Sequence, residues 1–192
     1  MNTQYAPRIT EKNMSAHTFV AYVEDKPGVL NRVASLFRRR TFNIESLTVG
    51  HTDQPGVSRM TIVVDTDELG ARRVEANLYK LVNVLRVDNV TSQATVERDL
   101  ALIKVKAGDG KRTEILQLVE VYRARVVDIT GDSVIVEITG TEDKIESMVE
   151  ILRPFGIIEM VRTGVVSMTR GSQAVSANPP LVAAMIPEAS LN

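Results

Sequence analysis

The sequence predicts an α+β protein built from two consecutive βαββαβ units. Two observations predict this class. First, short segments in which apolar residues alternate with period two are interleaved with longer segments in which they recur every three or four residues. Second, the order of these segments repeats in the C-terminal half, and in each half a short turn joins the two middle strands. Each unit is therefore expected to be ferredoxin-like, with two helices packed on one face of an antiparallel sheet.

The first unit is predicted over residues 17–92, after a polar and unpatterned stretch, 1–16, that we expect to be a flexible N-terminus. Thr66 or Asp67 can cap its second helix, and the turn formers in 51–56 join its two middle strands as a hairpin. The predicted strands are 17–24, 44–50, 57–65 and 84–90, and the predicted helices are 29–40 and 68–80.

The second unit is predicted over residues 100–170, after a linker at 93–99. Gly131-Asp132 is a two-residue hairpin signal, and the last strand is expected to bend at Gly164. The predicted strands are 100–107, 125–130, 133–139 and 157–168, and the predicted helices are 112–124 and 142–152. The tail, 171–192, has no periodicity and is expected to be disordered, although its apolar residues could instead dock on a partner.

The turn between the first strand and the first helix carries the strongest functional signal. It reads Asp25-Lys26-Pro27-Gly28, and the first N–H groups of the helix, near Val29 and Leu30, lack intrahelical partners. The helix dipole favours an anion there, such as a carboxylate. Asp25 offers a charge for an ammonium group, and Asn43, beyond the helix, can donate and accept. These groups predict a pocket for a small zwitterion, an amino acid.

An alternative interpretation of this turn needs no ligand. Asp25 could simply cap the helix in an ordinary strand-to-helix connection. The second unit has Gly108-Asp109-Gly110-Lys111 at the equivalent place and nothing that matches Asn43. The predicted ligand site therefore belongs to the first unit alone.

Composition excludes several classes of function. With 44% hydrophobic residues, 24% charged residues and a net charge of −1, the chain is typical of a soluble globular protein and gives no general reason to expect nucleic acid or a membrane as partner. The absence of cysteine excludes disulfides and thiolate chemistry and fits the cytoplasm. No signal peptide or membrane helix is expected. His17 and His51 lie far apart with no carboxylates at ligand spacing, so neither a metal site nor a catalytic set is expected.

RNA binding is a further alternative, because βαββαβ is also the order of RNA-recognition modules and the first helix contains Arg32 and Arg38-Arg39-Arg40. Those modules stack bases on aromatic residues of the central strands. The chain has only four Phe and four Tyr, and none of them lies in 58–64. A solvated or partner-facing helix is therefore favoured. The stretch 108–112 lacks the spacing of a P-loop and is interpreted as a turn.

Several stretches resemble a known family. The turn and helix start, 24–30, resemble the ACT domain, a ferredoxin-like module that senses small molecules. More narrowly, the chain resembles the small regulatory subunit of acetolactate synthase from residue 17 to residue 171. The stretches that carry this resemblance are Asn43-Ile44-Glu45-Ser46-Leu47-Thr48-Val49, Ser58-Arg59-Met60-Thr61, 81–87, Val96-Glu97-Arg98 and 162–171.

This resemblance implies a regulatory subunit that does no chemistry and binds no cofactor itself. It implies a large catalytic partner that holds thiamine diphosphate, Mg²⁺ and FAD and condenses two pyruvates, or pyruvate and 2-oxobutyrate. The small subunit would stimulate that partner and confer feedback inhibition by valine or another branched-chain amino acid. A stand-alone amino-acid sensor is the alternative.

The resemblance also assigns an effector site between the ACT domains of a homodimer, so that residues after the helix complete a site begun by the turn of the other chain. Two departures from the family are visible: Thr41 stands where a glycine is usual, and Asp25 replaces a common asparagine. The effector-binding residues implied are Asp25, Gly28, Val29, Leu30, Asn43 and Ile44.

Overall fold

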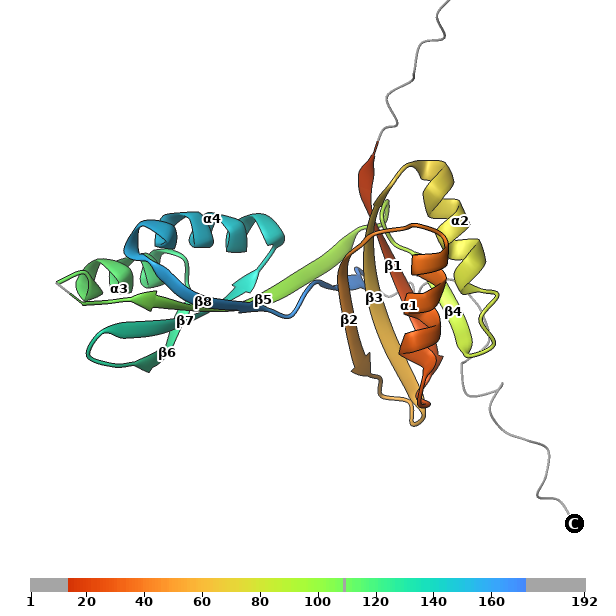
Figure 1. Cartoon of the computed structure of the whole chain (residues 1–192), viewed down its shortest axis with the longest axis horizontal. Helices are drawn as coiled ribbons and strands as arrows, with labels where there is room; N and C mark the ends of the chain where they lie inside the picture. The colour runs from red at the N-terminus through yellow and green to blue at the C-terminus, as the bar shows by residue number, and fades with distance from the viewer. Residues whose placement is uncertain (1–13, 109, 172–192) are drawn as a thin grey trace, which may run out of the picture.

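The computed structural model of the chain describes residues 14–108 and 110–171. Figure 1 shows the two βαββαβ units side by side, with one long strand running from the first into the second. The predicted fold class is confirmed. The tail expected to be disordered lies outside the described residues beyond Gly171. Most of the expected flexible N-terminus also lies outside them, but Ser15 and Ala16 already belong to the first strand.

The first unit forms a four-stranded antiparallel sheet in the order β2-β3-β1-β4. Both helices pack on one face, and the fully buried Phe19, Phe37 and Ile62 lie in the core between helices and sheet. The Asp67 carboxylate accepts a 2.7 Å hydrogen bond from the Gly70 N–H and so caps the second helix. The elements are β1 (Ser15–Glu24), α1 (Val29–Arg39), β2 (Ile44–His51), β3 (Val57–Thr66), α2 (Glu68–Leu78) and β4 (Val84–Asn89).

The second unit repeats this topology, with the strand order β6-β7-β5-β8 and a separate core that contains Ile103, Ile115 and Met148. The described part of the chain contains no helix long and apolar enough to cross a membrane. The elements are β5 (Thr95–Lys106), α3 (Arg112–Val121), β6 (Arg125–Ile129), β7 (Ser133–Gly140), α4 (Glu142–Leu152), a 3-10 turn (Arg153–Phe155), β8 (Ile157–Arg162) and β9 (Val166–Thr169).

The connection between the units differs from the prediction in two ways. The segment expected as a linker, 93–99, is mostly strand, because β5 begins at Thr95 and its first residues pair with β9. The expected last strand, 157–168, is two strands, because the chain turns at Gly164 with φ 85°. A Cβ at Gly164 would lie 2.6 Å from the Ser46 Oγ of the first unit, so the turn needs glycine for its conformation and for space.

Thr41, directly after α1, is held in the left-handed region with φ 57°. That conformation costs a residue with a Cβ about 1–2 kcal/mol, and the greater freedom of glycine in the unfolded chain offsets about 0.4–1 kcal/mol. We therefore expect Thr41→Gly to raise the free energy of unfolding by about 0.5 kcal/mol, measured by urea denaturation. Thr41→Ala is the matched control, since it keeps the Cβ. If Thr41→Ala raised the free energy of unfolding as much as Thr41→Gly, the strain argument would be contradicted.

Candidate functional site

The predicted turn has the geometry of a helix start built on glycine. Gly28 precedes α1 with φ 83°, in the left-handed region, and its carbonyl accepts the first helical hydrogen bond from the Arg32 N–H at 3.1 Å. The Asp25 N–H donates to the Gly56 carbonyl at 2.8 Å, which ties the turn to the β2–β3 hairpin. A Cβ built on Gly28 meets no atom within 4 Å, so the turn is open to solvent.

The N–H groups at the start of α1 are arranged differently from the prediction in one respect. The Val29 N–H donates to the Lys26 carbonyl at 3.3 Å, so this group is already used within the turn, and the Val29 side chain is buried in the core. Among the described residues, the N–H groups of Leu30 and Asn31 have no acceptor. They are the donors available to an anion at this end of the helix.

Asp25 does not cap the helix, because no side chain caps α1. Its carboxylate instead lies 3.3 Å from Nδ1 of His51, at the end of β2, and is 46% exposed. A carboxylate this accessible, in the same turn that leads to the free N–H groups, is suited to the ammonium group of a zwitterion. Sequence reasoning missed His51 as a neighbour of Asp25, because only the β2–β3 hairpin brings the two together.

Asn83, a second residue that sequence reasoning missed, connects the residue before the turn to α1 through hydrogen bonds. The Asn83 carbonyl accepts from the Glu24 N–H at 2.9 Å, and the Asn83 side-chain amide donates to the Glu24 carboxylate. The Asn83 side-chain oxygen in turn accepts from Arg32 on α1. The hydrogen bond from Asn83, followed by that from Lys26, lowers the pKa of Glu24 below its ordinary value of 4.5.

We expect Asn83→Ala to raise the pKa of Glu24 toward its ordinary value, because the largest cause of the lowering is removed. A lowered pKa in the folded state contributes stability above the unfolded pKa, which is lost as the pH falls through the folded pKa. The variant should therefore lose stability at neutral pH and show less further loss below about pH 4.5 from this group. NMR titration of the Glu24 carboxyl carbon measures the pKa. Lys26→Gln should raise the pKa of Glu24 by less than Asn83→Ala does. A rise as large as that of Asn83→Ala, or larger, would contradict the assignment of Asn83 as the main cause of the lowered pKa.

Asn43 and Ile44 lie at the far end of α1 from the turn. Asn43 is exposed and its amide donates to the Glu45 carboxylate, while Ile44 begins β2 and packs against the core. The helix has 11 residues, which at about 1.5 Å per residue separates its ends by roughly 16 Å. A single chain therefore does not bring Asn43 and Asp25 into one pocket.

The turn presents groups that are chemically suited to a zwitterion, and its described residues form no group of metal ligands. Within residues 14–108 and 110–171, no three His, Asp or Glu side chains come together as a candidate metal site. Leu30, whose side chain is exposed beside the free N–H groups, offers an apolar surface to a ligand. What these residues can do is recognise a carboxylate, an ammonium group and an apolar side chain.

Comparisons with known proteins match both units. The family model described as the small subunit of acetolactate synthase matches residues 98–171, and the model described as an AHAS small subunit-like ACT domain matches residues 19–86. The acetolactate synthase small subunit of Mycobacterium leprae is 47% identical over 162 residues, covering 84% of this chain and 96% of that protein. The Bacillus subtilis protein of the same name is 47% identical over 152 residues, covering 79% and 88%.

A solved structure agrees with these relatives. The crystal structure of the acetolactate synthase small subunit from Thermotoga maritima has a TM-score of 0.77 and 41% sequence identity to this chain. The match covers 82% of this chain and 98% of that one, so it extends over both units.

Proposed function

The chain belongs to the acetolactate synthase small-subunit family, and we propose that it binds a large catalytic subunit, stimulates it and confers feedback inhibition by valine or another branched-chain amino acid. In this proposal the large subunit supplies thiamine diphosphate, Mg²⁺ and FAD and carries out the condensation. This chain contributes regulation alone.

The observation that carries the regulatory half of the proposal is the turn before α1. The effector carboxylate would accept from the free N–H groups of Leu30 and Asn31, and its ammonium group would lie at the exposed Asp25 carboxylate. Its branched side chain would pack on the apolar surface of Leu30. The departure from asparagine at Asp25 adds a charge that should strengthen the hold on the ammonium group.

A homodimer would complete this site. β2 is an edge strand of its sheet, and two-fold pairing of β2 edges would set the α1 helices of two chains antiparallel. The turn of one chain would then lie beside the end of the partner's α1, where Asn43 and Ile44 are found. An effector that touches both chains would bind one dimer arrangement more tightly than another, and only such a difference can transmit inhibition, typically about 1–3 kcal/mol.

Reconstitution tests the proposal. Acetolactate formation by the purified large subunit is measured alone, with this chain, and with this chain plus valine, leucine or isoleucine. The proposal predicts a rise on adding the chain and a fall on adding an effector. Stimulation without inhibition would remove the feedback role. Amino-acid binding, detected as a rise in melting temperature, without any effect on the large subunit would instead support the stand-alone sensor.

A further inference from the structure

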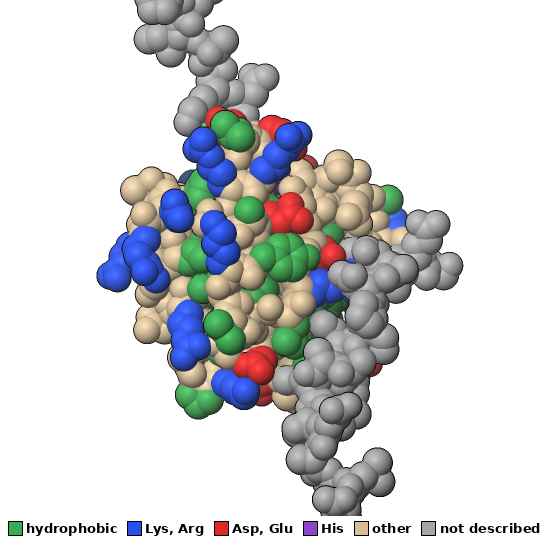
Figure 2. Space-filling model, turned by 90° about the vertical axis from the view of Figure 1, so that its right-hand side faces the viewer, with side chains coloured by type: hydrophobic (Ala, Val, Ile, Leu, Met, Phe, Trp, Pro, Cys, Tyr) green, Lys and Arg blue, Asp and Glu red, His purple; other side chains and the backbone are tan. Residues whose placement is uncertain are grey.

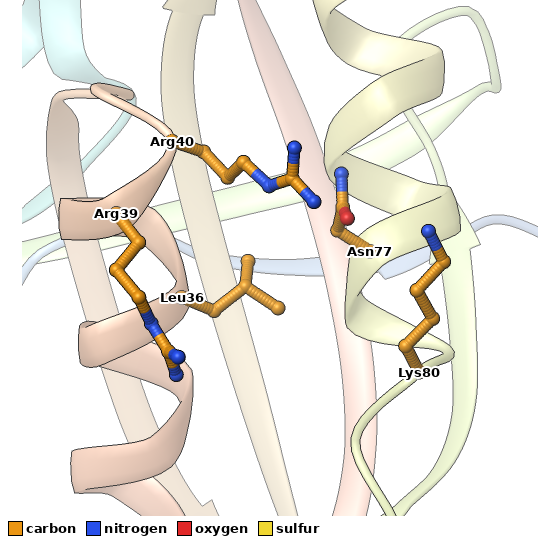
Figure 3. Close-up of a pocket in the computed structure, with 5 residues that line it drawn as sticks. All are labelled: Leu36, Arg39, Arg40, Asn77 and Lys80. Atoms are coloured by element: carbon orange, nitrogen blue, oxygen red, sulfur yellow. The ribbon is translucent and has the colours of Figure 1, made fainter.

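A basic cleft lies between the helices of the first unit, at their C-terminal ends and away from the turn. It comprises two adjoining hollows of about 340 and 320 Å³ that share Arg40, Asn77 and Lys80, and Arg39 lines the first while Arg73 lines the second. Figure 3 shows the Arg40 side chain extending from the end of α1 toward Asn77 on α2. Leu36 and Asn77, which also line the cleft, are both buried.

The cleft carries an excess of positive charge. Arg39, Arg40, Arg73 and Lys80 are four cations, and none of the described residues that line the two hollows is acidic. The two helix ends contribute about −0.5 charge each, so roughly three positive charges are left uncompensated. Figure 2, which looks onto the side of the first unit that carries its helices, shows Lys and Arg side chains gathered there.

Three of these cations are unpaired among the residues that the structure describes. Within the described part of the chain, the side chains of Arg40, Arg73 and Lys80 make no hydrogen bond or ion pair. Arg39 donates to its own helix, at the Ser35 carbonyl. Their positions follow from helical spacing, since Arg73 and Asn77 are four residues apart on α2 and Leu36 and Arg40 are four apart across the end of α1. The cleft is therefore formed by two adjacent helix ends, and three of its four cations are available to a ligand.

We propose that this cleft binds a compact polyanion of the phosphate class, such as pyrophosphate or a phosphate ester. Guanidinium groups bind phosphate oxygens through paired N–H donors, and Lys80 adds a point charge. Each hollow is within the size range of small-molecule sites. An amino acid does not fit this chemistry, because none of the described lining residues offers a carboxylate to receive its ammonium group.

A compact ligand is favoured over nucleic acid by the shape of the surface. Proteins that hold a single strand follow its backbone with a charged groove and stack its bases on aromatic side chains. Here the cations converge on two adjoining hollows, and Phe42 is the one aromatic residue among the described residues that line them. In the proposed homodimer the partner's turn would lie near this end of α1, but none of the described residues that line the cleft is an effector residue, so the two sites can be tested with different variants.

Isothermal titration calorimetry of the full chain with sodium pyrophosphate, without divalent cations, tests the proposal. The chain should bind pyrophosphate saturably, with one ligand per chain. Arg40→Gln/Lys80→Gln should weaken binding by at least about tenfold, because two charge-assisted contacts are lost. Arg38→Gln/Arg72→Gln is the matched control, since it removes two cations from the same helices that do not line the cleft.

Three results would overturn the proposal. One is the absence of saturable pyrophosphate binding by the wild-type chain. Another is an equal loss of binding in both double variants, which would indicate a diffuse surface potential instead of a site. The third is tighter binding of single-stranded RNA than of pyrophosphate with the same dependence on Arg40 and Lys80, which would assign the cleft to nucleic acid. Melting temperatures close to wild type in both double variants would establish that folding is intact.

Discussion

Replacing Gly28 with aspartate is expected to abolish the proposed feedback inhibition by valine and to leave the proposed stimulation of the large subunit largely intact. The new carboxylate would occupy the open space at the start of α1, where the effector carboxylate would otherwise meet the N–H groups of Leu30 and Asn31. Two like charges about 4 Å apart repel by roughly 1 kcal/mol in water and 4 kcal/mol near a protein surface. Near the protein surface this repulsion raises the valine concentration needed for inhibition by roughly several hundredfold, which abolishes inhibition in the working range; in water the rise would be about fivefold.

This variant needs a control for backbone strain, because Gly28 has φ 83° and aspartate there is disfavoured by about 1–2 kcal/mol. Gly110→Asp supplies it. Gly110 lies in the equivalent turn before α3, has φ 79° and meets no atom within 4 Å of a built Cβ. The two variants should lose similar stability, and only Gly28→Asp should lose inhibition.

Acetolactate formation with increasing valine measures the result, with each variant added to the large subunit. Unchanged inhibition by Gly28→Asp would exclude this helix start as the carboxylate site. Loss of stimulation and inhibition together, in this variant alone, would mean that the turn serves the contact with the large subunit. The basic cleft is tested separately, by pyrophosphate binding to the Arg40→Gln/Lys80→Gln variant.

The sequence predicted the elements of both units well, because each has a strong local pattern. The tight turn that contains Asp25 and Gly28 could also be predicted, because a strand that runs into a helix through Pro-Gly has few ways to turn; the role of these residues in effector binding stays a prediction. His51 and Asn83 could not, because their roles depend on strands that arrive beside the turn from elsewhere in the chain. The use of the Val29 N–H by Lys26 depends on the exact turn geometry, which sequence patterns do not determine.

The connection between the two units could not be predicted from the sequence for the same reason. Thr95 belongs to a strand only because β9 pairs with it, and that pairing requires the chain to turn at Gly164. Nothing local to 93–99 indicates this long-range partner. The contacts that hold the turn also come from the first unit, where the Ser46 Oγ accepts from the Val165 N–H at 3.0 Å and the Thr48 Oγ1 donates to the Val165 carbonyl at 3.1 Å.

Asp99 organises this junction, and Asp99→Ala is expected to be the most destabilising single change considered for the chain. Its side chain is 1% exposed and accepts from the Arg162 guanidinium at 2.6 and 2.8 Å. Its other oxygen accepts from the Thr163 hydroxyl and the Gly164 N–H, both at 3.1 Å. The carboxylate thus fixes the end of β8 and the turn that leads to β9.

Removing one partner of a buried ion pair costs about 3–5 kcal/mol. Arg162 is 26% exposed and also lies 3.4 Å from Glu146, which would stabilise it in part, so the lower end, about 3 kcal/mol, is expected. At about 2–4 °C per kcal/mol for a chain of this size, the melting temperature should fall by roughly 6–12 °C.

Arg125→Ala is the matched control for Asp99→Ala, because Arg125 pairs with Glu137 across neighbouring strands of the same sheet but is 74% exposed. Exposed pairs contribute less than about 1 kcal/mol, so the melting temperature should change by only a few degrees. Similar melting of both variants would mean that the Asp99 contacts contribute little to stability. A large fall for Asp99→Ala alone would establish that this buried carboxylate stabilises the end of β8 and the turn to β9, the same turn that bonds to Ser46 and Thr48 of the first unit.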